Sequence, residues 1–128
     1  MDVINHKVLI VEDEVSLLKA LSQKFKEDGF EVFEAQNGIE GLKQVEKHEP
    51  HMILLDIAMP KMDGIKFMQK LRGDEKNTDT KVIILTNYQA DDRIISGLAG
   101  TNPSYYLVKS EWNISDIIGK VREVLASE

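Results

Sequence analysis

The stretch Val8-Leu9-Ile10-Val11-Glu12-Asp13 is a short apolar run that ends in two acidic residues. Two further apolar runs, at 52–55 and 82–85, are also bounded by polar or turn-forming residues. Short runs rich in Val, Ile and Leu are typical of parallel strands that are buried on both faces. Two weaker runs, at 31–35 and 105–108, alternate more or carry aromatic residues, as strands nearer a sheet edge do. The sequence therefore predicts five strands.

Segments with helical periodicity lie between these runs and after the last one. Four of the helices are predicted to begin just after Asp13, Asn37, Asp63 and Asn113. The first helix is expected to end at Asp28-Gly29. The remaining helix, near 90–99, contains Gly97 at a cost of about 1 kcal/mol relative to Ala, so we expect it to be the most mobile. The positions expected to face the core are Leu18, Leu21, Phe25, Ile39, Leu42, Val45, Ile65, Met68, Leu71, Ile114, Ile117, Ile118, Val121 and Leu125.

Strict alternation of strands and helices calls for right-handed crossovers and a parallel sheet covered on both faces. The fold class expected is therefore α/β, a doubly wound (βα)5 domain with a five-stranded parallel sheet over residues 1–128. In such sheets, ligands bind beyond the carboxyl ends of the strands, where the strand order reverses. The chemistry is expected at that edge.

Composition and charge exclude several classes of protein. The chain has no cysteine, so it has no disulfide framework and no thiolate metal site. Its net charge is −6 and it has no cluster of Lys and Arg, which argues against direct binding of nucleic acid. No signal peptide is recognisable at the start, and no apolar run approaches the roughly 20 residues that span a bilayer. We expect a cytoplasmic protein with protein partners and no membrane contact.

Polar side chains follow four of the predicted strands. Glu12 and Asp13 follow the first, Asp56 the third, Thr86 the fourth and Lys109 the fifth. Converging carboxylates repel each other unless a hard cation lies among them, and such oxygen ligands suit Mg²⁺ or Mn²⁺. A hydroxyl and an ammonium group beside an acidic metal pocket are what a transferring phosphoryl group needs.

Simpler interpretations of the same residues remain open. Asp13 can favour a helix N-terminus by roughly 0.3 to 1 kcal/mol. Thr86 can bond locally through its hydroxyl, and Lys109 can be an ordinary solvated lysine. Asp56 is harder to explain in this way, because it ends an entirely apolar strand and the residues that follow offer no use for a helix cap.

The motifs Val8-Leu-Ile-Val-Glu-Asp-Glu14, Ile53-Leu-Leu-Asp-Ile-Ala-Met-Pro60 with Met62-Asp-Gly64, Thr86, and Tyr106-Leu-Val-Lys109 occur in this order. Together they resemble the receiver-domain family of bacterial two-component signalling, and the likeness covers essentially the whole chain. The resemblance implies the flavodoxin-like strand order 2-1-3-4-5. It also implies that Asp56 accepts a phosphoryl group from the phosphohistidine of a sensor histidine kinase or a phosphotransfer protein.

Further site residues are implied by the same resemblance. The implied metal ligands are Asp13, Asp56, the backbone carbonyl of Ala58 and, through a water molecule, Glu12. The groups implied to hold phosphoryl oxygens are Thr86, Lys109 and the backbone amides of Ile57 and Asn87. Thr86 and Tyr106 are implied to be a switch pair that alters the surface of the fourth helix, fifth strand and fifth helix for a downstream protein target. No enzymatic turnover is expected beyond the chain's own phosphoryl transfer and slow self-dephosphorylation.

Departures from the family pattern occur at Ser110, at Asn87 and at Thr101-Asn-Pro-Ser104. Ser110 follows the lysine where the family has a proline with a cis bond, which would cost a serine about 2.5 to 4 kcal/mol. Asn87 stands where a small residue is more usual, and Tyr88 follows it, so their bulk can shield the acyl phosphate from water. Ala58 cannot orient an attacking water molecule, and we therefore expect slow self-dephosphorylation.

Three alternative functions compete with the receiver assignment, and the extent of the whole protein stays open. A pseudo-receiver that binds partners without phosphorylation is the main alternative. A flavin carrier is disfavoured by the acids of the first loop, and an aspartyl phosphatase by the lack of a second acid at Ala58. The chain is either a single-domain regulator or a piece of a longer regulator or hybrid kinase.

Overall fold

The computed structural model describes residues 6–59 and 61–127. Pro60 of the quoted motif lies outside the described residues. The elements, in chain order, are β1 (Lys7–Val11), α1 (Val15–Glu27), β2 (Glu31–Ala35), α2 (Gly38–His48), β3 (Met52–Leu55), α3 (Gly64–Gly73), β4 (Lys81–Thr86), α4 (Asp92–Leu98), β5 (Tyr105–Val108) and α5 (Ile114–Ala126), with short 3-10 helices at Glu75–Asn77 and Lys109–Glu111.

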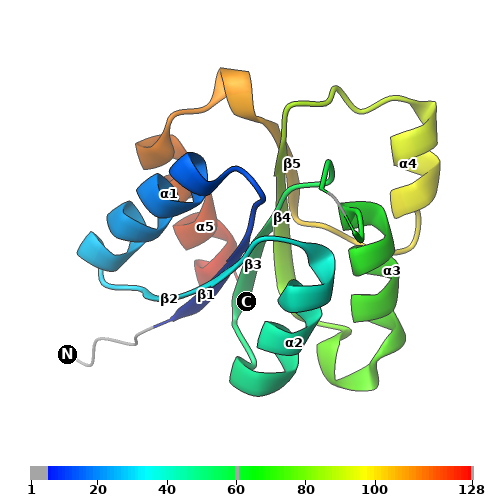
Figure 1. The fold of residues 1–128 in the computed structure, drawn as a ribbon, viewed down its shortest axis with the longest axis horizontal. Helices are drawn as coiled ribbons and strands as arrows, with labels where there is room; N and C mark the ends of the chain where they lie inside the picture. The colour runs from blue at the N-terminus through cyan, green and yellow to red at the C-terminus, as the bar shows by residue number, and fades with distance from the viewer. Residues whose placement is uncertain (1–5, 60, 128) are drawn as a thin grey trace.

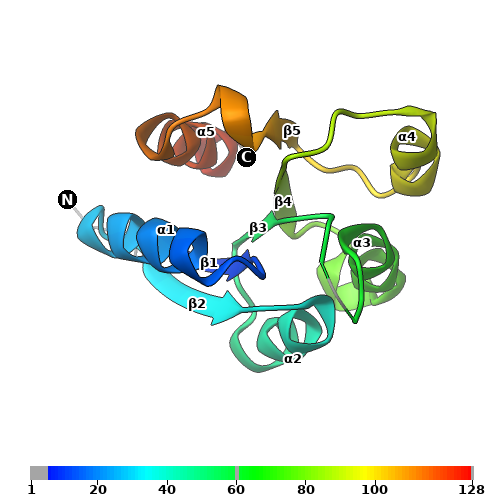
Figure 2. The same ribbon diagram turned by 45° about the horizontal axis from the view of Figure 1, so that its top comes forward.

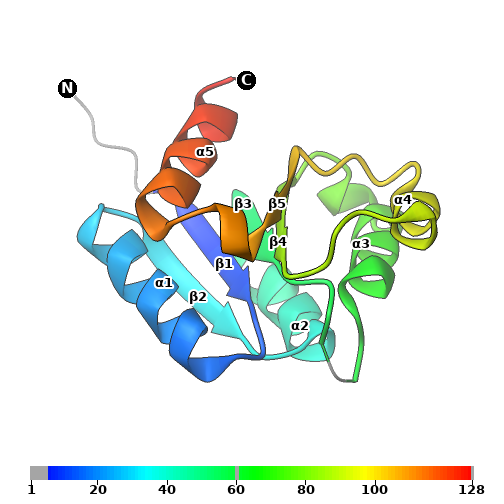
Figure 3. The ribbon, with the colours of Figure 1, turned by 90° about the horizontal axis from the view of Figure 1, so that it is seen from above.

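The strands form one parallel sheet in the order β2-β1-β3-β4-β5. This order reverses between β1 and β3, and helices cover both faces of the sheet (Figure 1). Helices α1 and α5 lie on one face, and α2, α3 and α4 lie on the other, as two further views show (Figures 2 and 3). The predicted α/β fold and its strand order are confirmed.

Alternating residues of each central strand enter two separate cores. Val8 and Ile10 of β1 pack with α1 and α5, whereas Leu9 and Val11 pack with α2, α3 and α4. Successive side chains of a strand point to opposite faces, so a strand covered on both sides must be apolar throughout. This requirement explains the uninterrupted apolar runs in the sequence.

Short polar side chains begin most of the helices. Asn37, Asp63 and Asn113 each accept a hydrogen bond from the backbone N–H three residues on, at 2.8 to 2.9 Å. Asp91 does the same for α4, bonding the N–H of Ile94 at 2.9 Å. Each such cap satisfies a donor that the helix itself leaves free, which is worth about 1 kcal/mol. The predicted starts of α2, α3 and α5 are therefore confirmed, whereas the cap of α4 was not anticipated.

One predicted core position is wrong. Ile39 of α2 is 42% exposed, and the helix instead buries Gly38, Gly41 and Val45. A Cβ atom at Gly41 would lie 2.9 Å from the ring of Phe67, so only glycine lets α2 come this close to α3 and the sheet. Close approach turns the glycine face inward and leaves Ile39 at the surface.

Gly97 of α4 has a packing role that its helix propensity conceals. A Cβ atom there would lie 2.8 Å from the side chain of Ile65 on α3. The Gln69 side chain also donates to the Gly97 carbonyl at 3.1 Å. This glycine therefore sets the contact between α3 and α4, and the mobility of α4 stays a prediction.

The segment before β5 is held by an arginine of α3. Arg72 donates to the carbonyls of Thr101, Asn77 and Asn102 at 2.7, 2.8 and 3.5 Å. Asn102 has a left-handed backbone, with φ of 50°. Thr101 is buried and its hydroxyl bonds the Leu98 carbonyl at 2.6 Å. One side chain thus joins the turn that follows α3 to the segment before β5.

Among the helices of residues 6–59 and 61–127, none has the length and apolar character needed to cross a membrane.

Candidate functional site

The carboxyl ends of β1 and β3 bring the acidic residues together. Val11 pairs with Leu55, so Glu12 and Asp56 leave the sheet side by side. The N–H of Asp56 donates to the Val11 carbonyl at 3.0 Å, and that of Glu12 donates to the Ala35 carbonyl at 2.9 Å. The sheet hydrogen bonding therefore continues one residue past each strand and fixes the backbone of both acids.

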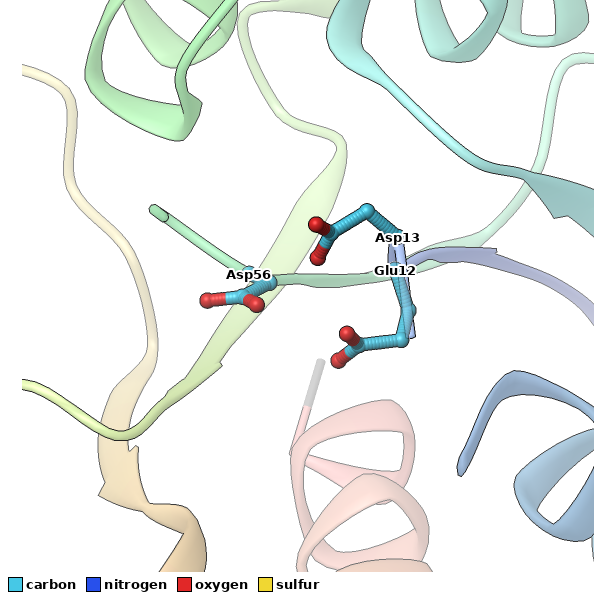
Figure 4. Close-up of side chains that lie close together, drawn as sticks. All are labelled: Glu12, Asp13 and Asp56. Atoms are coloured by element: carbon cyan, nitrogen blue, oxygen red, sulfur yellow. The ribbon is translucent and has the colours of Figure 1, made fainter. Parts of the chain in front are cut away.

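Three carboxylates meet at this edge. Carboxylate oxygens of Glu12, Asp13 and Asp56 all lie within 4.8 Å of one another, and the side chains converge from β1 and β3 (Figure 4). Glu12 and Asp56 are 2% and 4% exposed, whereas Asp13 is exposed to solvent. Closely spaced oxygen ligands with one open side fit a hard divalent cation such as Mg²⁺ or Mn²⁺, which keeps some of its waters.

Lys109 enters the same cluster from the end of β5. Its Nζ lies 2.8 Å from Oε1 of Glu12 and 3.1 Å from Oδ2 of Asp56. Burial works against the charged amine, but the bonds to Glu12 and Asp56 outweigh it and raise the pKa of Lys109. Burial also raises the pKa of Glu12, against the opposing effect of its bonds to Lys109 and to the Glu14 N–H. The ammonium group partly neutralises two buried carboxylates.

Thr86 ends β4 with a hydroxyl that has no hydrogen-bond partner among the described residues. Its side chain is fully buried, with 0% exposure. Buried hydroxyl groups are nearly always hydrogen-bonded, so the unpaired Thr86 hydroxyl needs an explanation beyond the contacts of the described chain. The local bond considered as an alternative is absent from the described part of the chain. The site thus has an unused donor and acceptor near its acidic cluster.

The loop after β3 shapes the surroundings of Asp56. The N–H of Ala58 donates to Oδ1 of Asp56 at 3.1 Å, and the N–H of Gly64 donates to the Ile57 carbonyl at 2.9 Å. A Cβ atom at Gly64 would lie 2.6 Å from both the Asp56 carbonyl oxygen and the Ile57 Cα. The start of α3 therefore packs directly against the backbone of Asp56 and Ile57. The Met62-Asp-Gly motif is the feature of the sequence that indicates this contact.

A hollow of about 380 Å³ opens beside Asp13 and the loop that follows Asp56. It is lined by Asp13, Ile57, Ala58, Met59, Asp63, Ile65, Tyr88 and Arg93. Ile57 and Ala58, two of the predicted backbone contacts, thus border both Asp56 and this space. Asn87, the other predicted amide donor, follows Thr86 and is exposed. Sequence reasoning did not identify Arg93, because nothing in its local pattern links it to the strand ends.

Tyr106 of β5 contacts the same region. Its hydroxyl donates to the Tyr88 carbonyl at 2.8 Å, and burial raises its pKa. Tyr106 pairs with Ile84 and Val108 with Thr86, so the Tyr106 and Thr86 side chains lie on the sheet face that carries α4. The two proposed switch residues therefore share one side of the sheet.

The turn after Lys109 adopts a trans peptide bond. No described peptide bond is cis, and residues Lys109–Glu111 form a short 3-10 helix that leads toward α5. Ser110 therefore occupies a turn that keeps Lys109 directed at the carboxylates.

The chain is similar to a phosphotransferase and to transcriptional regulators of bacteria. It is 37% identical over 90 residues to sporulation initiation phosphotransferase F of Bacillus subtilis, covering 70% of this chain and 71% of that protein. It is 31% identical over 120 residues to the DNA-binding dual master transcriptional regulator RpaA of Synechocystis, covering 93% of this chain and 48% of that protein. The chain thus spans about half the length of such transcriptional regulators. Relatives of this kind are named as DNA-binding or transcriptional regulators, so the comparisons do not support our expectation that this protein makes no contact with nucleic acid.

The fold has equally clear relatives. A response regulator receiver domain protein (CheY-like) from Methanospirillum hungatei superimposes with a TM-score of 0.87 at 26% identity, covering 96% of this chain and 95% of that one. The family model described as the response regulator receiver domain matches residues 8–122, which contain all the strands except the first residue of β1 and all the site residues discussed above. With its strand order, its converging acids and this match together, the chain belongs to the response regulator receiver domain family.

Proposed function

We propose that this chain is the phospho-accepting receiver of a two-component phosphorelay, with Asp56 as the acceptor. The observation that carries the proposal is the meeting of the Glu12, Asp13 and Asp56 carboxylates within 4.8 Å, with Lys109 3.1 Å from Asp56. The phosphodonor is the phosphohistidine of a sensor histidine kinase or of a phosphotransfer protein. An Asp56 oxygen attacks phosphorus, an O–P bond forms, and the P–N bond breaks to give an acyl phosphate.

Each neighbouring group has a distinct part in this reaction. The ammonium of Lys109 and the hydroxyl of Thr86 bind phosphoryl oxygens, since Lys109 already contacts Asp56 and Thr86 has no other partner among the described residues. The backbone amides of Ile57 and Asn87 add two further donors. Positioned donors of this kind stabilise the charge of a transferring phosphoryl group.

The acidic cluster would hold Mg²⁺ or Mn²⁺ through Asp13, Asp56 and the carbonyl of Ala58, with Glu12 acting through a water molecule. A bound divalent cation offsets the charge that two carboxylates and a phosphoryl group bring together. The exposed side of Asp13 supports this assignment, because it leaves room for the water molecules that such ions retain.

Phosphorylation is proposed to act through Thr86 and Tyr106. When Thr86 binds the phosphoryl group, Tyr106 changes its packing and alters the surface of α4, β5 and α5. The bond from Tyr106 to the Tyr88 carbonyl supports such a link between this surface and the hollow beside Asp56. The partner at this surface is a downstream protein target, in the cytoplasm and without direct contact of residues 1–128 with nucleic acid.

A second candidate is a pseudo-receiver that binds partners without phosphorylation. The contacts of Lys109 with both Glu12 and Asp56 favour this alternative, because they offset part of the negative charge of the cluster through the protein's own side chain. Labelling at Asp56 separates the two candidates.

The deciding experiment is the intact mass of the protein after incubation with acetyl phosphate and Mg²⁺. A gain of about 80 Da in the wild type, absent from Asp56→Asn and from an EDTA sample, is the expected result. A wild type that gains no mass would favour the pseudo-receiver. Rapid release of phosphate with turnover would favour a phosphatase instead.

The lifetime of the phosphoryl group tests the role proposed for Tyr88. Tyr88 is 48% exposed and lines the hollow together with Ala58, so its ring can hinder the approach of water to the acyl phosphate. Tyr88→Ala is expected to shorten the half-life, measured by intact mass after removal of the donor. An unchanged half-life would count against this shielding.

A further inference from the structure

Arg93 lines the hollow beside the proposed phosphoacceptor. It lies in the first turn of α4 and shares the hollow with Ile57 and Ala58, which follow Asp56 in the chain, and with Asp13, whose carboxylate lies within 4.8 Å of that of Asp56. Among the described lining residues, Arg93 is the one cation, and Asp13 and Asp63 are the acids. An anionic molecule that enters the hollow therefore meets two carboxylates and a single guanidinium group.

The position of Arg93 is built into the fold. Asp91 caps α4 by bonding the Ile94 N–H at 2.9 Å, which fixes the turn that carries Arg93. The Tyr106 hydroxyl holds the Tyr88 carbonyl at 2.8 Å and so fixes the adjoining wall. No carboxylate of the described chain lies within 4.0 Å of the Arg93 guanidinium, although Asp91 and Asp92 precede it directly. Its charge is therefore available to a molecule in the hollow.

We propose that Arg93 contacts the leaving group of small phosphodonors and favours those whose leaving group is anionic, namely small acyl phosphates. This inference rests on the proposed function, because it concerns a second class of donor for the same acceptor, Asp56. In the reaction with acetyl phosphate, an Asp56 oxygen forms a bond to phosphorus and the bond from phosphorus to the acetate oxygen breaks. Acetate leaves with the electron pair, and Arg93 interacts with the negative charge that develops on its oxygens.

Phosphoramidate provides the matched comparison. Its nitrogen is already protonated, so when the P–N bond breaks the electron pair goes to nitrogen and neutral ammonia leaves, and no negative charge develops on the leaving group. A guanidinium group in the hollow gives that reaction no comparable stabilisation. The ratio of the two rate constants therefore isolates the leaving-group role of Arg93 from any effect on Asp56 or on metal binding.

The test compares the rates at which the two donors add a phosphoryl group to Asp56, at constant Mg²⁺ and roughly physiological ionic strength. Arg93→Gln is expected to lower the acetyl phosphate rate by roughly three- to tenfold and to change the phosphoramidate rate by less than about twofold. Arg93→Lys, which keeps the charge, is expected to recover most of the loss. Arg122→Gln removes a guanidinium that pairs with Asp28 at an exposed site on α5, and it is expected to match the wild type.

Several results would overturn the inference. Equal losses with both donors would mean that Arg93 supports the site as a whole, and an unchanged acetyl phosphate rate would mean that it has no part. An equal loss of the acetyl phosphate rate in Arg122→Gln would mean that the effect comes from the overall charge of the protein and not from the position of Arg93. If the wild type accepts a phosphoryl group from neither donor, the proposed function itself fails. If the wild type reacts with both donors and Arg93→Gln leaves the ratio of the two rate constants unchanged, only the inference about Arg93 fails.

Discussion

Replacement of Lys109 by methionine removes the cation that the structure places among the acids. The Lys109 Nζ lies 2.8 Å from Glu12 and 3.1 Å from Asp56, and the three side chains are 12%, 2% and 5% exposed. Methionine has a similar length and no charge, so Lys109→Met leaves two nearly buried carboxylates without a counter-charge. The structure predicts a less stable protein in the absence of divalent ions.

The size of the effect follows from the geometry. Removal of one partner from a buried ion pair costs about 3 to 5 kcal/mol. Glu12 can escape part of this cost by taking up a proton, because burial already raises its pKa. Asp13 and the hollow also give the cluster a solvated side. We therefore expect Lys109→Met to lower the free energy of unfolding by about 2 to 4 kcal/mol at neutral pH.

Urea unfolding in EDTA and in excess Mg²⁺ measures both parts of this prediction. A cation that binds only the folded state at about 100 times its dissociation constant stabilises it by about 2.7 kcal/mol. Mg²⁺ should stabilise Lys109→Met more than the wild type, because the lysine no longer competes for the carboxylates. Lys43→Met, at an exposed position on α2, is the control. A Lys109→Met protein as stable as the wild type in EDTA, or one that gains no more from Mg²⁺, would refute the reasoning.

Three further predictions test other parts of the structure. In urea unfolding, Gly64→Ala is expected to lower the free energy of unfolding by about 1 to 3 kcal/mol, because the added Cβ would lie 2.6 Å from the Asp56 carbonyl oxygen. Gly119→Ala, whose Cβ would have no atom within 4 Å, should stabilise α5 by up to about 1 kcal/mol, and equal effects of the two substitutions would contradict this prediction. Arg72→Met should speed amide hydrogen exchange at residues 99–104 relative to the control Lys70→Met, since three backbone carbonyls lose their Arg72 donor. Unchanged exchange would argue against the role of Arg72 in holding this segment. Burial raises the pKa of Tyr106 in the folded protein above its ordinary value of 10.0, so its contribution to stability is full below pH 10 and is lost as the pH rises through the folded pKa. In a pH titration followed by absorbance at 295 nm, Tyr106→Phe should remove a tyrosine that ionises above pH 10. Removal of a tyrosine that ionises at a lower pH would contradict the assignment.

The sequence by itself determined those features that depend on near neighbours in the chain. Uninterrupted apolar runs predicted the three central strands, because a strand buried on both faces must be apolar at every position, and weaker alternating or aromatic runs predicted the two edge strands. Asn37, Asp63 and Asn113 predicted helix starts, because each bonds an N–H only three residues away. Parallel strands end at one edge, so the acids after β1 and β3 were expected to meet, and they do.

Contacts between distant segments were beyond the reach of those patterns. Ile39 fits the helical period as well as Val45 does, yet it is exposed because Gly41 packs against Phe67 of another helix. Ser110 suggested an altered turn after β5, but only the folded chain decided that Lys109 still reaches Glu12 and Asp56 through a trans bond.

The hollow beside Asp56 is the clearest example of what only the tertiary structure decided. Its walls come from the ends of β1 and β3, the start of α3, the loop after β4 and the first turn of α4. Period and capping report interactions within about four residues, whereas this space depends on how closely α3 and α4 approach, at Gly97 and Ile65. Arg93 therefore became a candidate only when packing had brought α4 beside the acidic edge of the sheet.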